Sequence, residues 1–227
     1  MNNLNDSCVL FFIKYPIKGQ VKTRLSAELG TDIVVELYGQ FILDTLSTLQ
    51  QLNVPFRICY HPDSAKEKLI EWLGGQYSYT PQSGENLGER MKNAFLHAFG
   101  DNFRRVIIIG SDSPDLPADF LTQALHALES NDAVIGRSAD GGYYLIGFSQ
   151  AHFLPEAFDD ILWSTNSVFK QTLDVLNRHL YRVHILPQWY DVDTLADLNG
   201  LLARNRNTNF NRSKTFAYLL QIEDNKV

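Results

Sequence analysis

The sequence has few cysteines and no long apolar run. Its 227 residues include two cysteines, Cys8 and Cys59. Both fall in or beside expected strands, so we interpret them as buried reduced thiols and not as a disulfide framework. No hydrophobic stretch approaches the roughly 20 residues that a membrane-spanning helix needs, and the N-terminus does not resemble a signal peptide. These absences predict a cytoplasmic protein without a membrane span.

Signatures of several enzyme classes are also missing. The six histidines have no zinc-ligand spacing, and no Cys/His zinc pattern occurs. The P-loop, the G-x-G-x-x-G dinucleotide fingerprint and the G-x-S-x-G nucleophile motif are absent. Each of these motifs has a defined mechanical role in its class, so their absence excludes the P-loop, dinucleotide-binding and hydrolase classes that depend on them.

Basic residues are fewer than acidic ones, so the formal net charge is −6. This balance argues against a nucleic-acid partner, which usually requires a broad cationic surface. A few local cations still suffice for a small nucleotide. The hydrophobic content of 44% and the charged content of 20% are typical of a globular protein. A chain of this length can bury one large core.

Hydrophobic periodicity predicts alternating strands and helices in the first part of the chain. Helices are expected over about 31–50, 64–73, 86–99 and 117–129, with Asn86 as one N-cap. This alternation favours a parallel sheet with right-handed crossovers. The expected strands that precede these helices are Cys8–Lys14, Phe56–Tyr60, Tyr77–Pro81 and Arg105–Gly110.

The pattern changes after residue 130. Asp132–Arg137 and Gly142–Phe148 are typical of an antiparallel hairpin around an Asp-Gly turn. A helix over about 164–179, a strand over 181–186 and a helix from Thr194 follow. The predicted fold class is therefore α/β, with one domain over 8–205 and a mixed, mostly parallel, Rossmann-like sheet. We expect residues 206–227 to form a C-terminal extension that is partly helical or loose.

The first expected strand leads into a basic loop that Pro16 and Gly19 interrupt. Ligands of open α/β sheets collect at the carboxyl ends of strands, where loop cations and helix-start N–H groups suit phosphate. A solvated basic turn is the alternative interpretation. The cations of this loop are Lys14, Lys18, Lys22 and Arg24.

Carboxylates follow two later strands. Asp112 comes directly after the most apolar strand, and Mg²⁺ or Mn²⁺ sites often combine one or two carboxylates with the phosphates of the substrate. We therefore favour a metal role for Asp112 and a helix-cap role for Asp115. Asp191 and Asp193 would point to the same side of an extended segment. Asp193 is equally well explained as the N-cap of the next helix.

Three segments have both a structural and a functional interpretation. Gln82 can read the edge of a base and Arg90 can bind a phosphate, although an ordinary loop glutamine and an exposed arginine explain them as well. The Asp140–Tyr143 turn is explained by hairpin geometry, while its second glycine and Tyr143 also suit close approach of a substrate. Trp163 precedes an expected helix that Ser164 or Thr165 would cap, and it can also line the acceptor side.

Taken together, these motifs resemble a bacterial glycosyltransferase-like family of the nucleotide-diphospho-sugar transferase superfamily, with the A-type glycosyltransferase fold. The chain is also similar to the nucleotidyltransferases that make activated phospholactate in deazaflavin cofactor synthesis. The resemblance covers roughly residues 8–200. It rests on K-x-P-x-x-G-x-V-K-T-R-L from Lys14, Q-x-G-x-x-L-G-x-R-M from Gln82, G-S-D-x-P from Gly110, D-G-G-Y from Asp140, W-S-T from Trp163 and D-V-D-T from Asp191.

The resemblance implies a site for a nucleotide and a small-molecule acceptor. Lys22, Asp112 and Asp193 would be catalytic, and Asp112, Asp191 and Asp193 would hold Mg²⁺ or Mn²⁺. The acceptor would meet Asp140, Gly141, Gly142, Tyr143 and Trp163. The nucleotide would meet Lys14, Gly19, Lys22, Thr23, Arg24, Gln82, Gly84, Leu87 and Arg90.

The function that we expect is a metal-dependent transferase that uses a nucleotide-sugar or a nucleoside triphosphate. The family resemblance favours glycosyl transfer. Nucleotidyl transfer with release of pyrophosphate is the alternative, because both reactions need the same cations beside the phosphates. A non-catalytic nucleotide-binding protein is the second alternative. A monomer or a homodimer is expected.

Overall fold

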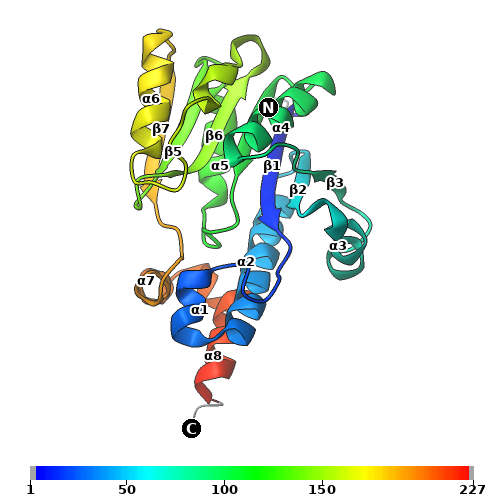
Figure 1. Ribbon diagram of the computed structural model, residues 1–227, viewed down its shortest axis with the longest axis vertical. Coiled ribbons are helices and arrows are strands. Elements are labelled where there is room, and N and C mark those ends of the chain that lie inside the picture. Colours follow the sequence, from blue (N-terminus) through cyan, green and yellow to red (C-terminus); the bar gives the residue numbers. More distant parts are fainter. Residues whose placement is uncertain (1–3, 225–227) are drawn as a thin grey trace.

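A seven-stranded sheet with the order β3-β2-β1-β4-β6-β5-β7 forms the centre of the computed structural model, which describes residues 4–224 (Figure 1). The strands are β1 (Ser7–Lys14), β2 (Phe56–His61), β3 (Ser78–Pro81), β4 (Arg105–Ile109), β5 (Ala133–Ser138), β6 (Tyr143–Ser149) and β7 (Val183–Trp189). Each expected strand is present, with ends that shift by a few residues.

The sheet is mixed and mostly parallel, as predicted. Strand β1 runs parallel to β2 and to β4, and β2 runs parallel to β3. Strand β6 is antiparallel to both β4 and β5, which confirms the hairpin, and β5 is parallel to β7. The carboxyl ends of β1, β4, β5 and β7 therefore lie at one edge of the sheet, where ligands bind in open α/β folds.

Helices cover both faces of the sheet. Successive residues of β4 alternate between the two cores: Ile107 and Ile109 face one, and Val106 and Ile108 face the other. This alternation explains why the strand is apolar throughout. The helices are α1 (Thr23–Leu29), α2 (Thr31–Gln51), α3 (Lys66–Leu73), α4 (Leu87–Gly100), α5 (Ala118–Ala127), α6 (Val168–Arg178), α7 (Leu195–Asn205) and α8 (Lys214–Asp224).

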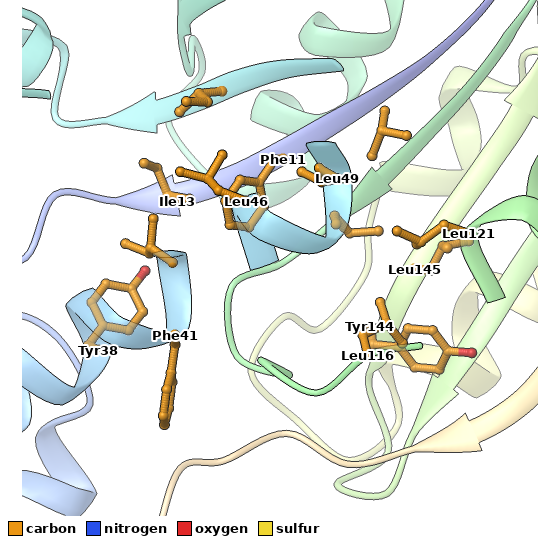
Figure 2. Packing of buried hydrophobic residues seen from close by; sticks show 14 of the residues in the cluster. Phe11, Ile13, Tyr38, Phe41, Leu46, Leu49, Leu116, Leu121, Tyr144 and Leu145 are labelled. Carbon is orange, nitrogen blue, oxygen red and sulfur yellow. The ribbon is translucent and has the colours of Figure 1, made fainter. Parts of the chain in front are cut away.

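The larger core lies between the sheet and α2, α5 and α7, and the other lies beneath α4 and α6. Figure 2 shows Phe11 and Ile13 of β1 in the same buried cluster as Tyr38 and Phe41 of α2. All four side chains are buried. Full burial of a side chain of this size stabilises the fold by about 1.5–3 kcal/mol, so α2 is firmly held against β1.

Helix starts account for most of the corrections to the expected elements. Asn86 caps α4 as predicted, since its side chain accepts a hydrogen bond from the Glu89 N–H. Of the two interpretations of Asp193, the helix cap is wrong: Thr194 caps α7 in a capping box with Asp197. Helix α6 begins at Val168, later than expected, because Ser164 has a left-handed φ of 64° that a helix does not accept.

The segment after residue 205 docks onto the domain. The Asp44 carboxylate of α2 accepts hydrogen bonds from the backbone N–H groups of Lys214 and Thr215, each at 2.9 Å. These bonds satisfy N–H groups at the start of α8, which packs beside α2 (Figure 1). Residues 225–227 of the expected extension lie outside the described part.

The structure also bears on the expectations for the two cysteines and for membrane-spanning helices. Cys8 and Cys59 are both free and buried, as predicted. Among residues 4–224, every helix is too short or too polar to cross a membrane.

Candidate functional site

A cavity of about 570 Å³ opens at the carboxyl edge of the sheet. The loop after β1, the loop after β4, the first turns of α4, strand β6 and the segment after β7 all contribute to its wall. The basic loop and the two carboxylate segments of the sequence therefore meet at one place, although they lie far apart along the chain.

Lys22 is the centre of the polar part of this cavity. Its Nζ lies 2.5 Å from Oδ1 of Asp112 and 2.8 Å from Oδ1 of Asp193. Arg24 reaches the same aspartate from the other side, with Nη2 2.8 Å from Asp193 Oδ2. The Lys22 side chain is only 4% exposed, whereas that of Asp112 is 49% exposed and that of Arg24 is 69% exposed. One buried ammonium thus bridges two carboxylates that open toward solvent.

The local backbone explains how Lys22 reaches this position. Lys22 is the N-cap of α1 and has φ 47° and ψ 47°, in the left-handed region that costs a residue with a Cβ about 1–2 kcal/mol. Buried Val21 and Leu25 anchor the loop on either side. Packing therefore supports an unfavourable backbone conformation at a residue whose side chain meets both carboxylates, and such strain gathers at functional sites.

The charged groups in this cluster shift the pKa values of one another. Burial alone would lower the pKa of Lys22, but the charges of Asp112 and Asp193 outweigh it and raise that pKa above its ordinary value. Burial would raise the pKa of Asp193, but Lys22 and Arg24 outweigh it and hold that pKa below its ordinary value. Lys22 is therefore a cation and Asp193 an anion throughout the neutral range.

The loop that carries Asp112 is fixed on both sides. Ser111 Oγ lies 2.7 Å from the Tyr38 hydroxyl of α2, which also accepts a hydrogen bond from the Lys14 N–H at 3.2 Å. The backbone carbonyl of Asp112 accepts a bond from the Val192 N–H at 2.8 Å. Asp112 therefore stands on a rigid support that joins the ends of β1 and β4 to the segment after β7.

Asp191 and Asp193 have different partners, although they lie two residues apart. Asp191 is half-buried and accepts hydrogen bonds from Ser113 Oγ at 2.6 Å and from Ser138 Oγ at 2.5 Å. Burial, together with the nearby charge of Asp112, raises the pKa of Asp191 to about 6. Asp191 thus ties the loop after β4 to the end of β5, while Asp193 faces the cavity. The predicted metal role of Asp191 stays a prediction.

Asp112 and Asp193 together suit a divalent cation. No group of three or more acidic, histidine or cysteine side chains is arranged for a metal within residues 4–224. Mg²⁺ is usually bound by one or two carboxylates plus phosphate oxygens of the substrate, so two carboxylates that already share one cation fit such an ion. Asp112 and Asp193 are thus the two carboxylates of the cavity that could hold such an ion.

Gln82 has a restricted role at the cavity wall. Its Nε2 donates to the carbonyl oxygens of Ile13 at 3.1 Å and Cys59 at 2.8 Å. Because both partners are acceptors, the orientation of the amide is fixed, and Oε1 is the atom that remains to read a ligand. Arg90 does not line the cavity, since its Nε donates to the Gly84 carbonyl at 3.1 Å.

The remaining predicted nucleotide residues divide into two groups. Lys14, Thr23 and Leu87 line the cavity. Gly19 does not, but its φ of 73° allows the basic loop to turn before Lys22. Lys18 forms an exposed ion pair with Asp32, which favours the solvated interpretation for that lysine.

The hairpin turn is explained largely by packing. Asp140 Oδ1 accepts the Gly142 N–H at 2.9 Å, and Gly141 has φ 94°. A Cβ on Gly141 would lie 2.1 Å from the Asn166 carbonyl oxygen. Tyr143 lines the cavity and packs edge-on against Trp163, with ring centroids 6.4 Å apart. Of the predicted acceptor residues, Tyr143 is thus the one that reaches the cavity wall.

Several residues of the site carried no recognisable signal in the sequence. Tyr38 reads there as one more apolar position of a helix, and its hydroxyl contact with Ser111 depends on how α2 packs. Ser113 and Ser138 look like ordinary loop and strand serines. Ser164 differs, because the sequence offered it as a helix cap within W-S-T; it lines the cavity and has a left-handed φ of 64°.

Comparisons with known proteins place the chain in a family. The family model described as uncharacterised proteins conserved in bacteria (DUF2064) matches residues 44–165. A protein from Desulfovibrio desulfuricans G20, a candidate nucleotide-diphospho-sugar transferase, is 44% identical, with a TM-score of 0.94. The alignment covers 97% of this chain and 96% of that one. No curated protein matches the sequence.

More distant solved structures share the fold. The 4-diphosphocytidyl-2C-methyl-D-erythritol synthase of Anaerococcus prevotii DSM 20548 has a TM-score of 0.56 at 13% identity, over 89% of this chain and 100% of that one. Rv0371c of Mycobacterium tuberculosis H37Rv, in complex with manganese, has a TM-score of 0.53 at 15% identity, over 88% and 100%. At these identities the likeness concerns the architecture alone.

Proposed function

Since the chain belongs to the bacterial DUF2064 family and has the nucleotide-diphospho-sugar transferase fold, we propose that it is a metal-dependent transferase. Its donor would be a nucleotide-sugar or a nucleoside triphosphate, bound in the cavity at the carboxyl edge of the sheet. The second substrate would be a small-molecule acceptor. Glycosyl transfer is the lead reaction, because the 44%-identical relative is described as a candidate nucleotide-diphospho-sugar transferase.

The contact of Lys22 with both Asp112 and Asp193 is the observation that carries this proposal. The cluster offers two carboxylates for a cation and three cationic side chains, Lys14, Lys22 and Arg24, around the same cavity. Phosphate groups need cations of this kind, and a divalent metal held by carboxylates usually completes its coordination with phosphate oxygens. A protein that stored only a neutral ligand would not need this arrangement.

In glycosyl transfer, an acceptor hydroxyl oxygen would attack the anomeric carbon of the donor sugar. The bond from that carbon to the phosphate oxygen breaks, and its electron pair leaves with the nucleoside diphosphate. The acceptor proton passes to a base or to water. Lys22, Lys14 and Arg24 would stabilise the negative charge that develops on the leaving phosphate. A metal ion bound at Asp112 and Asp193 would supply Lewis-acid stabilisation of the same oxygens.

Nucleotidyl transfer is the second candidate, because a neighbour in fold is a 4-diphosphocytidyl-2C-methyl-D-erythritol synthase. Here an acceptor oxygen would attack the α-phosphorus, and the bond to the bridging oxygen would break with release of pyrophosphate. The same cations would stabilise the charge on the departing pyrophosphate. The two reactions differ in their products, so product analysis separates them.

The test is a product assay with the purified protein and Mg²⁺ or Mn²⁺. Pyrophosphate release from each of the four nucleoside triphosphates would support nucleotidyl transfer, and nucleoside diphosphate release from nucleotide-sugars would support glycosyl transfer. Slow hydrolysis by water reports either activity before the acceptor is identified. If neither product forms, and nucleotides stabilise the protein equally with and without metal and in Asp112→Asn, the non-catalytic alternative replaces this proposal.

A further inference from the structure

Lys22 occupies the point between the two carboxylates at which a shared cation would sit. Its Nζ is in ion-pair contact with Oδ1 of both Asp112 and Asp193, at 2.5 and 2.8 Å. A carboxylate pair that binds Mg²⁺ or Mn²⁺ presents its oxygens to a common point in the same way, at slightly shorter distances. The ammonium is therefore a stand-in for the metal at this site.

The ammonium and a divalent ion cannot share this position. Like charges a few ångströms apart repel strongly in a partly buried site, where water screens them poorly. A metal ion that arrived at Asp112 and Asp193 would have to displace Lys22 into the cavity. Because the Lys22 side chain is almost fully buried, the displaced ammonium would need a new anionic partner to offset its desolvation.

The phosphates of a bound nucleotide would be that partner. Lys22 lines the same cavity as Lys14 and Arg24, so only a change in its side-chain direction is needed for it to leave the carboxylates. Arg24 differs, since it approaches Asp193 through the other carboxylate oxygen and is mostly exposed. It can stay in place when a metal binds. The metal position is thus blocked by one side chain, Lys22.

We propose that Lys22 is the resident counter-ion of the metal site, and that a divalent cation binds Asp112 and Asp193 only when phosphate has drawn Lys22 away. This inference rests on the proposed function, because it takes the nucleotide phosphates as the partner of Lys22. It makes metal and phosphate binding strongly cooperative and weakens binding of the metal alone. The backbone strain at Lys22 fits such a role, since a strained residue is readily biased between two arrangements.

The first experiment measures Mn²⁺ binding without any nucleotide, by electron paramagnetic resonance or calorimetry. Lys22→Gln should bind Mn²⁺ about tenfold or more tightly than the wild type, a coupling within the range usual for two linked ligands. Lys22→Arg keeps the cation and should stay near the wild type. Lys18→Gln is the matched control, because it removes a positive charge from the same loop, but that lysine is exposed, pairs with Asp32 and does not line the cavity. It should change the affinity by no more than about twofold.

Asp112→Asn in the Lys22→Gln background should abolish the gain, which shows that the new Mn²⁺ is bound by this carboxylate. Circular dichroism of each variant checks the fold. If Lys22→Gln does not fold, amine-selective labelling of the wild type replaces it. Labelling of Lys22, quantified by mass spectrometry, should be unchanged by Mn²⁺ alone and should change when Mn²⁺ and inorganic pyrophosphate are added together.

The inference is overturned if folded Lys22→Gln binds Mn²⁺ no more tightly than Lys18→Gln, or if Mn²⁺ alone alters the labelling of Lys22. These outcomes are separate from failure of the proposed function. A protein without turnover on any nucleotide could still gain Mn²⁺ affinity when Lys22 is replaced. An active transferase could equally show no gain in Mn²⁺ affinity in Lys22→Gln, and this result would contradict only the counter-ion role of Lys22.

Discussion

Asp115 anchors the loop that carries Asp112, and its removal should destabilise the whole domain. The Asp115 side chain is 1% exposed and accepts hydrogen bonds from Arg204 at 2.7 and 2.9 Å. It also accepts bonds from Asn205 at 2.6 Å and from the Trp189 indole at 3.2 Å. The expected helix-cap role of Asp115 is wrong, because Pro117 occupies the cap position of α5 and makes no side-chain bond there.

The size of the expected loss in unfolding free energy follows from the groups that Asp115→Ala leaves without a partner. Removing one partner of a buried ion pair costs about 3–5 kcal/mol, because the other charge loses its compensation. Arg204 is 22% exposed and lies over the Tyr190 ring at 5.2 Å, so it can turn toward water and keep part of its packing. Asn205 has no such route, since it is 6% exposed. We therefore expect a loss of about 3 kcal/mol, at the lower end of that range.

Urea unfolding, followed by circular dichroism, measures this free energy. Asp174→Ala is the matched control, since it also removes an aspartate from an ion pair, but from an exposed one with Lys170, where the side chains are 78% and 52% exposed. That control should change stability by no more than about 0.5 kcal/mol. A loss below about 1 kcal/mol for Asp115→Ala would refute the reasoning, because it would mean that the network is not coupled to the fold.

Three further changes have clear expected outcomes. Burial would raise the pKa of Asp132, but its hydrogen bonds with Arg182 and the charge of Arg182 outweigh it and hold that pKa below its ordinary value. This contribution to stability is present above the ordinary carboxyl pKa and is lost as pH falls through the folded value, so Asp132→Asn should flatten the loss of unfolding free energy below about pH 4. Gly141→Ala should cost more than about 1 kcal/mol in urea unfolding, given the positive φ and the Asn166 carbonyl, whereas Gly100→Ala meets no atom within 4 Å and should not. Arg24→Ala should weaken nucleotide binding in a thermal-shift titration and leave the melting temperature of the free protein nearly unchanged, because its side chain is 69% exposed. A large loss of stability without nucleotide would contradict this role.

The sheet and the position of the cavity were predictable from local patterns. The apolar run of β4 and the Asp-Gly turn between β5 and β6 each have one dominant physical explanation, and both expectations are confirmed. The basic loop and Asp112 were expected at one edge because parallel strands share the direction of their carboxyl ends. Such conclusions need only periodicity and turn chemistry.

The details of the site depend on tertiary contacts that no local pattern contains. Asp191 and Asp193 are two residues apart, yet Ser113 and Ser138 bind one while Lys22 binds the other. Thr194 caps α7 in a capping box with Asp197, while Asp193 pairs with Lys22 and Arg24. Sequence spacing could place these groups near each other, but it could not assign their partners.

The most direct test of the account is the metal-dependent release of nucleoside diphosphate or pyrophosphate by the wild type, Asp112→Asn and Asp119→Asn. Asp119 is an exposed aspartate in the first turn of α5 and does not line the cavity, so its replacement is the matched control. We predict that Asp112→Asn loses activity by about 100-fold or more and that Asp119→Asn keeps it. Equal rates for Asp112→Asn and the wild type, or full activity in the presence of a chelator, would contradict the central claim.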